Sequence, residues 1–301
     1  MRVCVNLLGA EQWFGGDLDG MINLVRLAER RGVDQVVLPE HVAFGDDLGG
    51  YPFGEFLGAR DSPWYEPIVL LAGIATATES IRLATGVLIA PLRPAVLLAK
   101  QLTTLDILSK GRLDIGVGTG WHKAEFDACG VSFDDRIGQL DEQVRACRAL
   151  WKTAPASFEG KYIRFSGLYQ RPAPRQAGGV PIWFGVPPSA ANFARIAEIG
   201  NGWLPMGLSA EKLAENVTKL RKAFVARGRD PSTVGIRHVL MPASGVKSNA
   251  DLASTLLEAK GWVDAGANII EMYPQMFCQR LEQFEDFLDG LLSLKKMDRC
   301  R

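Results

Sequence analysis

The 301-residue sequence has no excess of charge of either sign and no long apolar run. Basic and acidic residues number 34 each, so no net charge draws the whole chain to nucleic acid or to an anionic membrane. No apolar stretch reaches the roughly 18 residues that a membrane span needs, and the N-terminus does not read as a signal peptide. We therefore expect a cytoplasmic protein that acts on a small molecule.

Cysteine and histidine are too sparse and too scattered to suggest a disulfide framework or a metal site. The five cysteines include no Cys-x-x-Cys pair and are expected to be reduced packing groups. The three histidines, His41, His122 and His238, have no ligand-like spacing. The sequence therefore predicts no metal.

Short apolar runs, by contrast, are abundant and alternate with amphipathic segments. Continuous runs of this kind are typical of parallel strands buried on both faces. The predicted strands are Val3–Leu8, Gln35–Pro39, Ile81–Ala90, Arg112–Val117, Pro181–Val186, Gly202–Met206, Val234–Met241 and Asn268–Met272. Eight strands, each followed by a helix, predict an α/β fold of the (β/α)8 TIM-barrel type, with a doubly wound sheet as the alternative. No Pro/Gly/Ser-rich linker divides the chain, so residues 1–301 are expected to form a single domain.

Two insertions interrupt this alternation. The first, Val42–Glu66, follows the second strand and is long enough to suggest a functional lid. Its aromatic residues are candidates for a substrate pocket, or for ordinary loop packing: Phe53, Trp64 and Tyr65. The second insertion, Thr153–Gly179, follows the fourth helix and contains a predicted small β-hairpin at Phe158–Gly167.

Two acidic residues carry structural predictions. Asp135 is expected to cap the helix that contains Leu140 and Trp151. Asp106 and Arg112 flank the turn into the fourth strand and are expected to form an ion pair.

In a barrel of this type the chemistry lies at the carboxyl ends of the strands. The second strand ends in Glu40-His41, where the imidazole could exchange a proton with a ligand near neutral pH, or bond a loop neighbour instead. His122 begins a helix and is expected to be a capping or surface residue. His238 lies within a strand and is expected to be a core or barrel residue.

Glycines mark three other strand segments. Gly86 is costly within an apolar strand unless the backbone is bulged or closely approached. The fourth strand ends at Gly118–Gly120, which could form a phosphate-binding nest or a tight turn; Trp121 stands where a dinucleotide fingerprint needs glycine. The fifth strand leads to Ser189 at a helix start, with Arg195 two turns further on, and offers a second such nest.

The run from Ile81 to Trp121, with Pro39–His41 and Gly200–Trp203, resembles the bacterial luciferase-like monooxygenase superfamily. More narrowly, it resembles the branch that uses the deazaflavin coenzyme F420. The resemblance implies a homodimeric barrel that binds a flavin or deazaflavin at its carboxyl end. It implies these cofactor-binding residues: Thr85, Gly86, Val87, Thr119, Gly120, Gly185, Val186, Ser189 and Arg195.

Within that resemblance, Gly86-Val87 would be a non-proline cis peptide that backs the cofactor ring. His41, with Glu40, would be catalytic by bonding near the reacting ring edge and stabilising the reduced cofactor. The strand-end glycines would be small because a phosphate lies against the backbone. Trp121 stands where the sugar-phosphate dehydrogenases of this branch have a glutamate proton donor, so that activity is not expected.

The leading hypothesis is therefore an F420-dependent oxidoreductase that transfers a hydride to or from an unidentified small organic substrate. One alternative is a monooxygenase that uses FMN and molecular oxygen. Another is a barrel that binds a flavin-like ligand without catalysis.

Overall fold

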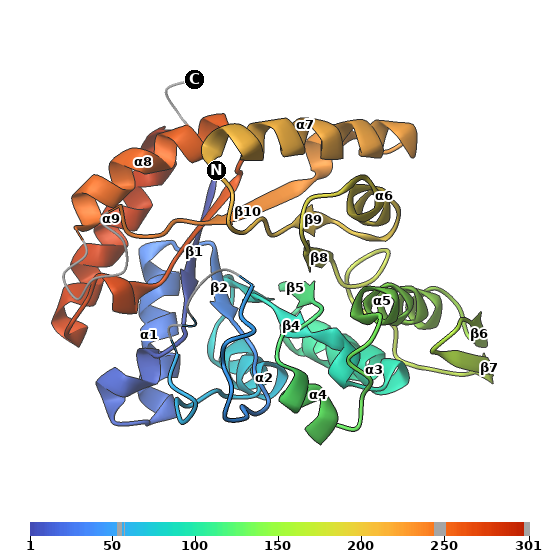
Figure 1. The fold of residues 1–301 in the computed structure, drawn as a ribbon. Helices are drawn as coiled ribbons and strands as arrows, with labels where there is room; N and C mark the ends of the chain where they lie inside the picture. Colours follow the sequence, from blue (N-terminus) through green and yellow to red (C-terminus); the bar gives the residue numbers. More distant parts are fainter. Residues whose placement is uncertain (53–55, 57, 244–250, 298–301) are drawn as a thin grey trace.

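The computed structural model of the chain describes residues 1–52, 56, 58–243 and 251–297. Its centre is a closed ring of eight parallel strands (Figure 1). In order around the ring they are β1 (Arg2–Asn6), β2 (Gln35–Leu38), β3 (Arg82–Thr85), β5 (Leu113–Gly118), β8 (Ile182–Gly185), β9 (Gly202–Trp203), β10 (Gly235–Val239) and β11 (Ile269–Met272). Pairing of β1 with β11 closes the ring, so the predicted (β/α)8 barrel is confirmed.

Helices surround the barrel (Figure 1). They are α1 (Leu18–Arg31), α2 (Pro67–Ala77), α3 (Ala95–Leu108), α4 (Lys123–Ala128), α5 (Arg136–Lys152), α6 (Ala190–Ile199), α7 (Ala210–Ala226), α8 (Leu252–Asp264) and α9 (Phe284–Met297). Short 3-10 turns are η1 (Ala10–Phe14), η2 (Ala90–Leu92), η3 (Pro231–Thr233), η4 (Pro274–Met276) and η5 (Leu281–Gln283). None of the described helices is long and apolar enough to cross a bilayer. The predicted cap at Asp135 is confirmed, because its carboxylate accepts from the Gly138 amide at the start of α5.

The predicted hairpin is also confirmed. Strands β6 (Ala156–Glu159) and β7 (Arg164–Leu168) pair antiparallel beside α5 (Figure 1). The Glu142 carboxylate on α5 accepts hydrogen bonds from the amides of Lys161 and Tyr162 at 2.7 and 2.8 Å. This side chain therefore ties the hairpin turn to the helix that precedes it.

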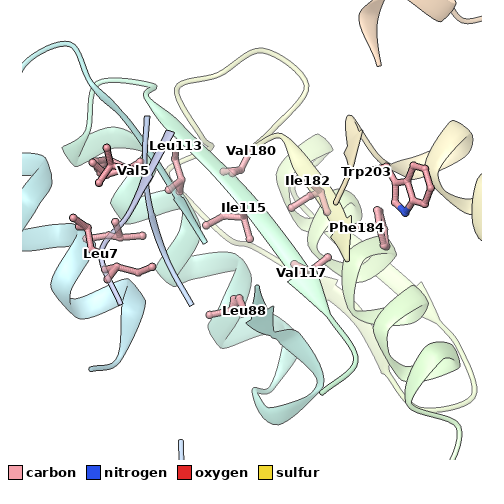
Figure 2. Packing of buried hydrophobic residues seen from close by; sticks show 14 of the residues in the cluster. Val5, Leu7, Leu88, Leu113, Ile115, Val117, Val180, Ile182, Phe184 and Trp203 are labelled. Carbon is pink, nitrogen blue, oxygen red and sulfur yellow. The ribbon is translucent and has the colours of Figure 1, made fainter. Parts of the chain in front are cut away.

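Alternation along the strands sorts side chains between two environments. Apolar residues of β5 and β8 point outward and pack under the helices (Figure 2): Leu113, Ile115, Val117, Ile182 and Phe184. Each such side chain stabilises the fold by about 1.5–3 kcal/mol on burial. The intervening residues of β5 face the barrel axis, where Asp114 accepts from Gln35 of β2 at 2.8 Å. The other two inward positions on β5 are glycines, Gly116 and Gly118.

The predicted strand Ile81–Ala90 is not continuous. It is split into β3 and the short β4 (Leu88–Ile89), with a cis peptide bond at Gly86-Val87 between them. β4 continues the parallel pairing with β5, because Ile89 lies opposite Gly118. The apolar pattern predicted both pieces but not the break.

The predicted ion pair between Asp106 and Arg112 is wrong. Asp106 instead accepts from the backbone and side-chain amides of Gln176 at 3.0 and 2.7 Å. The Arg112 guanidinium donates to backbone carbonyls, including those of Ala75 and Ile81 at 2.8 Å. Both residues still fix the turn into β5, but each does so by closing a different neighbouring loop.

Candidate active site

The centre of the candidate site is the Gly86-Val87 cis peptide at the carboxyl edge of β3, as the resemblance implied. A Cβ atom on Gly86 would lie 2.7 Å from Cγ1 of Val37 and 3.0 Å from Nη2 of Arg237, so only glycine fits. The preceding Thr85 is fully buried, and its hydroxyl donates to the Gly116 carbonyl at 2.7 Å. Thr85 therefore joins β3 to β5 and does not offer its hydroxyl to a ligand.

Val87 lies between the ends of two neighbouring strands. A Cβ atom on Gly118 would lie 2.5 Å from Cγ2 of Val87, and one on Gly185 would lie 2.7 Å from Cγ1. At Gly120, φ is +68° and a Cβ atom would meet the Phe126 ring at 2.7 Å. The structure thus gives a different reason for these strand-end glycines from the one expected. They make room for Val87 and Phe126, and no phosphate is needed to explain them.

The expected phosphate-binding residues lie in two places: Thr119 and Gly120 follow β5, and Gly185, Val186 and Ser189 lie at the end of β8 and in the turn into α6. The Ser189 hydroxyl caps α6 by accepting from the Asn192 amide at 3.1 Å. Val186 is buried, and its carbonyl accepts from the Trp203 indole at 2.9 Å. Among the described residues, the hydrogen bond found for the Thr119 hydroxyl is a long one, 3.4 Å, to the Gly120 carbonyl. The first backbone amides of α6 remain the natural donors for an anion here.

Arg195 does not supply a free positive charge to this region. Its Nε donates to Asp141 of α5 at 2.7 Å, and its guanidinium also contacts the Asn192 side chain. Asp141 in turn binds Arg145 at 2.7 Å. Arg195 therefore links α6 to α5, and its charge is already compensated.

His41 lies at the end of β2 and uses both ring nitrogens within the protein. Nδ1 is 3.1 Å from the buried Glu125 carboxylate, which also accepts from the Val42 amide. Nε2 accepts from the Trp121 indole at 3.2 Å. This pattern requires a neutral imidazole with its proton on Nδ1. His41 is therefore held in place by Glu125 and Trp121, and both of its ring nitrogens are occupied.

Glu40 is buried, and protein groups occupy its carboxylate. Its carboxylate accepts from the Ile89 amide at 2.6 Å and forms an ion pair with Arg93, which also binds Glu66 at 2.6 Å. Burial raises the pKa of Glu40, and the Arg93 guanidinium opposes that change. We therefore revise its expected catalytic role, because these bonds make Glu40 a positioning residue that ties β2 to β4.

Aromatic side chains surround His41, and we call this group the aromatic wall: His41, Phe44, Phe56, Trp64 and Trp121. The ring of Trp64 meets that of His41 edge-on at 4.9 Å. Its indole N–H is buried and has no partner among the described residues. Tyr65 packs against the main apolar core instead, so a place in the pocket is not supported for it. Phe53 lies outside the described residues.

The other two histidines have structural roles. His122 occupies the N-cap position of α4, as expected, but its side chain makes no capping hydrogen bond there. It is buried rather than at the surface, and its Nε2 accepts from the Gly45 amide at 2.7 Å. It therefore anchors the loop that carries the aromatic wall. His238 stacks on Trp262 of α8 at 3.8 Å, and burial lowers its pKa to about 4. His238 lies in the barrel strand β10, as expected, and the residue is partly buried.

A buried ion pair beneath Gly86 was not predicted from the sequence. Arg237 of β10 and Glu271 of β11 form an ion pair at 2.9 Å on the barrel axis. Asn6 of β1 donates to Glu271 at 2.6 Å, and Arg237 donates to the Thr85 carbonyl at 2.7 Å. The sequence does indicate this pair, because Arg237 and Glu271 each interrupt an apolar strand at a position whose side chain faces the barrel axis.

Two hollows of about 390 Å³ each lie elsewhere on the molecule. One surrounds Trp183 and Arg2 at the amino ends of the strands, the face that in such barrels serves stability. The other lies between α5, α6 and the hairpin, and Arg145 and Arg195 line it. The polar groups described above lie at the carboxyl ends of the strands, so we place the candidate site there.

A family model described as luciferase-like monooxygenase matches residues 3–291. The chain belongs to this family. It is 32% identical over 216 residues to the uncharacterised protein Rv0953c of Mycobacterium tuberculosis, covering 68% of this chain and 73% of that protein. It is 29% identical to an FMNH2-dependent dimethylsulfone monooxygenase of Pseudomonas putida, covering 72% of this chain but only 57% of that protein.

Solved structures show the same fold. Long-chain alkane monooxygenase LadA superposes with a TM-score of 0.77 at 16% identity, over 99% of this chain and 92% of that one. The coenzyme F420-dependent tetrahydromethanopterin reductase of Methanopyrus kandleri gives 0.73 at 15% identity, over 96% of each chain. Membership of the family makes the chain an oxidoreductase. The dimethylsulfone monooxygenase is named as FMNH2-dependent, and the tetrahydromethanopterin reductase, which shares the fold, as F420-dependent.

Proposed function

We propose that the chain transfers a hydride between coenzyme F420 and a small organic substrate at the carboxyl end of the barrel. The observation that carries the proposal is the side chain of Val87, which lies at the carboxyl edge of β3 between Gly118 and Gly185. We expect a planar ring to lie against Val87 and these strand ends.

The described residues fit a flavin-type group at this place. The buried Trp64 indole N–H has no partner among them and is available to an acceptor atom. The first amides of α6, next to Ser189, suit a phosphate. When bound, F420 would supply the hydride chemistry, and the chain would supply position and electrostatics.

The aromatic wall supplies that position and excludes water. His41 accepts from the Trp121 indole and donates to Glu125, so the Trp121 ring is fixed at the edge of the mouth. Trp121 also packs against Phe56 at 5.3 Å. A dry site of this kind strengthens every electrostatic interaction within it.

An FMN-dependent monooxygenase is the second candidate, and one observation favours it. F420 carries an acidic tail, and the basic groups that would receive it, Arg93 and Arg195, are already paired with carboxylates. FMN has a single phosphate and needs less positive charge. Against it, both nitrogens of His41 are occupied, which leaves no free imidazole nitrogen to assist oxygen chemistry.

The test is a titration of purified protein with F420 and, separately, with FMN, followed by ligand fluorescence. We expect F420 to bind at least about ten-fold more tightly than FMN, a difference of about 1.4 kcal/mol. Tight binding of FMN alone would move the chain to the monooxygenases and make oxygen consumption the next assay. If neither cofactor binds, the proposed function is wrong.

We also propose a homodimer formed by α2 and α3. Val69 of α2 and Leu97 of α3 are 73% and 50% exposed, and Ile107 and Leu108 of α3 are 39% and 40% exposed. Exposed apolar side chains on two adjacent helices are typical of an interface. Leu97→Glu should convert a dimer into a monomer in analytical ultracentrifugation, whereas Val225→Glu, at an exposed position on α7, should not. A wild-type monomer would refute the proposal.

A further inference from the structure

We infer that Tyr273 is a specificity-determining residue of this site, and that its phenol donates a hydrogen bond to an oxygen atom of an uncharged, largely apolar substrate. The inference rests on the proposed function, because it puts the substrate in the same mouth, above Gly86-Val87. Tyr273 directly follows β11 and therefore lies at the carboxyl end of the barrel.

Alternation along β11 directs the side chain inward. Ile269 and Glu271 face the barrel axis, whereas Ile270 and Met272 pack in the outer core beneath the helices. Tyr273 keeps an extended backbone, with φ of −98° and ψ of 107°, so the alternation continues through it. Its ring thus faces the mouth, one inward position above Glu271.

The surroundings of Tyr273 leave its hydroxyl available. The residue is partly buried, and none of the hydrogen bonds found among the described residues involves its hydroxyl. Burial and the nearby Glu271 raise the pKa of Tyr273, so the phenol keeps its proton and remains a donor. Tyr51 also raises the pKa of Tyr273 through its charge, and the Tyr51 ring packs on Trp121 at 5.4 Å. Tyr273 therefore lies between the axial ion pair and the aromatic wall.

The same surroundings define the class of substrate. Arg237 and Glu271 neutralise each other, so neither offers a free charge to an ionic substrate. Tyr51, Phe56 and Trp121 pack ring to ring above it and suit an apolar or aromatic body. A phenol adds one donor to this apolar surface. The arrangement matches a ketone, an aldehyde or a similar molecule with one acceptor oxygen.

The experiment compares two probes of nearly equal shape, acetophenone and α-methylstyrene, in which a methylene group replaces the carbonyl oxygen. Dissociation constants are measured by ligand-observed NMR on wild-type protein, Tyr273→Phe and the control Tyr169→Phe, whose side chain is 77% exposed. We expect the wild type and the control to prefer acetophenone by about five-fold, as one neutral hydrogen bond provides. Tyr273→Phe should abolish this preference while leaving the affinity for α-methylstyrene unchanged.

Two results would overturn the inference. One is an acetophenone preference that survives in Tyr273→Phe, or is absent from the wild type. The other is an equal loss of affinity for both probes in Tyr273→Phe, since the Tyr273 side chain would then act through packing alone. Affinities of the wild type for F420 and FMN are measured alongside. If neither cofactor binds but the preference depends on Tyr273, the proposed function fails and the role of the phenol stands.

Discussion

The contact of Val87 with two strand-end glycines makes a quantitative prediction about Gly118. Its backbone is not in the left-handed region, so alanine is permitted there apart from the contact with Val87. The added methyl group would lie 2.5 Å from Cγ2 of Val87, which must then move. Overpacking of this kind costs about 1–3 kcal/mol. We expect Gly118→Ala to lower the free energy of unfolding by that amount and to weaken binding of the proposed cofactor, because Val87 must move.

The double variant Gly118→Ala/Val87→Ala isolates this contact. Val87→Ala alone removes two methyl groups, at a cost of about 0.8 kcal/mol each when fully buried, and Val87 is only partly buried. With Cγ2 gone, Gly118→Ala should cost little more, so the two changes should be coupled by about 1–2 kcal/mol.

Urea denaturation of the two single variants and the double variant measures the coupling. Gly261→Ala is the matched control, because that glycine lies within α8 with nothing within 4 Å of an added Cβ. It should raise stability by about 0.5–1 kcal/mol. Additive costs for Gly118→Ala and Val87→Ala, or a Gly118→Ala variant within about 0.5 kcal/mol of wild type, would refute the reasoning.

Two further predictions concern buried ionisable groups. The pKa of His238 falls from 6.5 to about 4 on folding. The free energy of unfolding should therefore hold its full value above pH 6.5 and fall by up to about 3 kcal/mol as the pH drops toward 4. Urea titrations at pH 7.5 and 5 should show that His238→Phe removes this dependence. Arg93→Met leaves Glu40 buried without its cation and should cost about 3–5 kcal/mol. Because burial already raises the pKa of Glu40, that variant should lose stability as the pH rises through this pKa, and Arg93→Met/Glu40→Gln should recover most of the loss; equal stability of the two variants at pH 8 would contradict this.

The barrel could be predicted from the sequence because parallel strands buried on both faces must be apolar along their length. That rule located every strand of the ring, but it could not locate their limits. Gly202–Met206 shortens to the two residues of β9, and Ile81–Ala90 breaks at Gly86. Apolar composition is compatible with either a strand or a bulge, and only the neighbours of Gly86 decide between them. The cis peptide was accordingly predicted by resemblance and not by the pattern.

The site was harder to predict because the sequence identifies residue types and not their partners. His41 was expected to face a ligand, but its bond to Glu125 joins residues 84 positions apart. Arg195 is likewise paired with Asp141, 54 positions away, and His122 anchors Gly45 across 77 positions. His41 and Arg195 thus looked available for a ligand, but remote protein groups occupy them.

Two further positions of the barrel wall follow the same logic. Val186 is buried, and its carbonyl is fixed by Trp203. The Oδ1 atom of Asn201 accepts from the Ile182 amide at 3.0 Å and from Arg148 at 2.7 Å. An amide oxygen serves these donors as a carboxylate would, without a further buried charge. Both residues therefore stabilise the barrel wall, because their polar atoms are already occupied by protein groups.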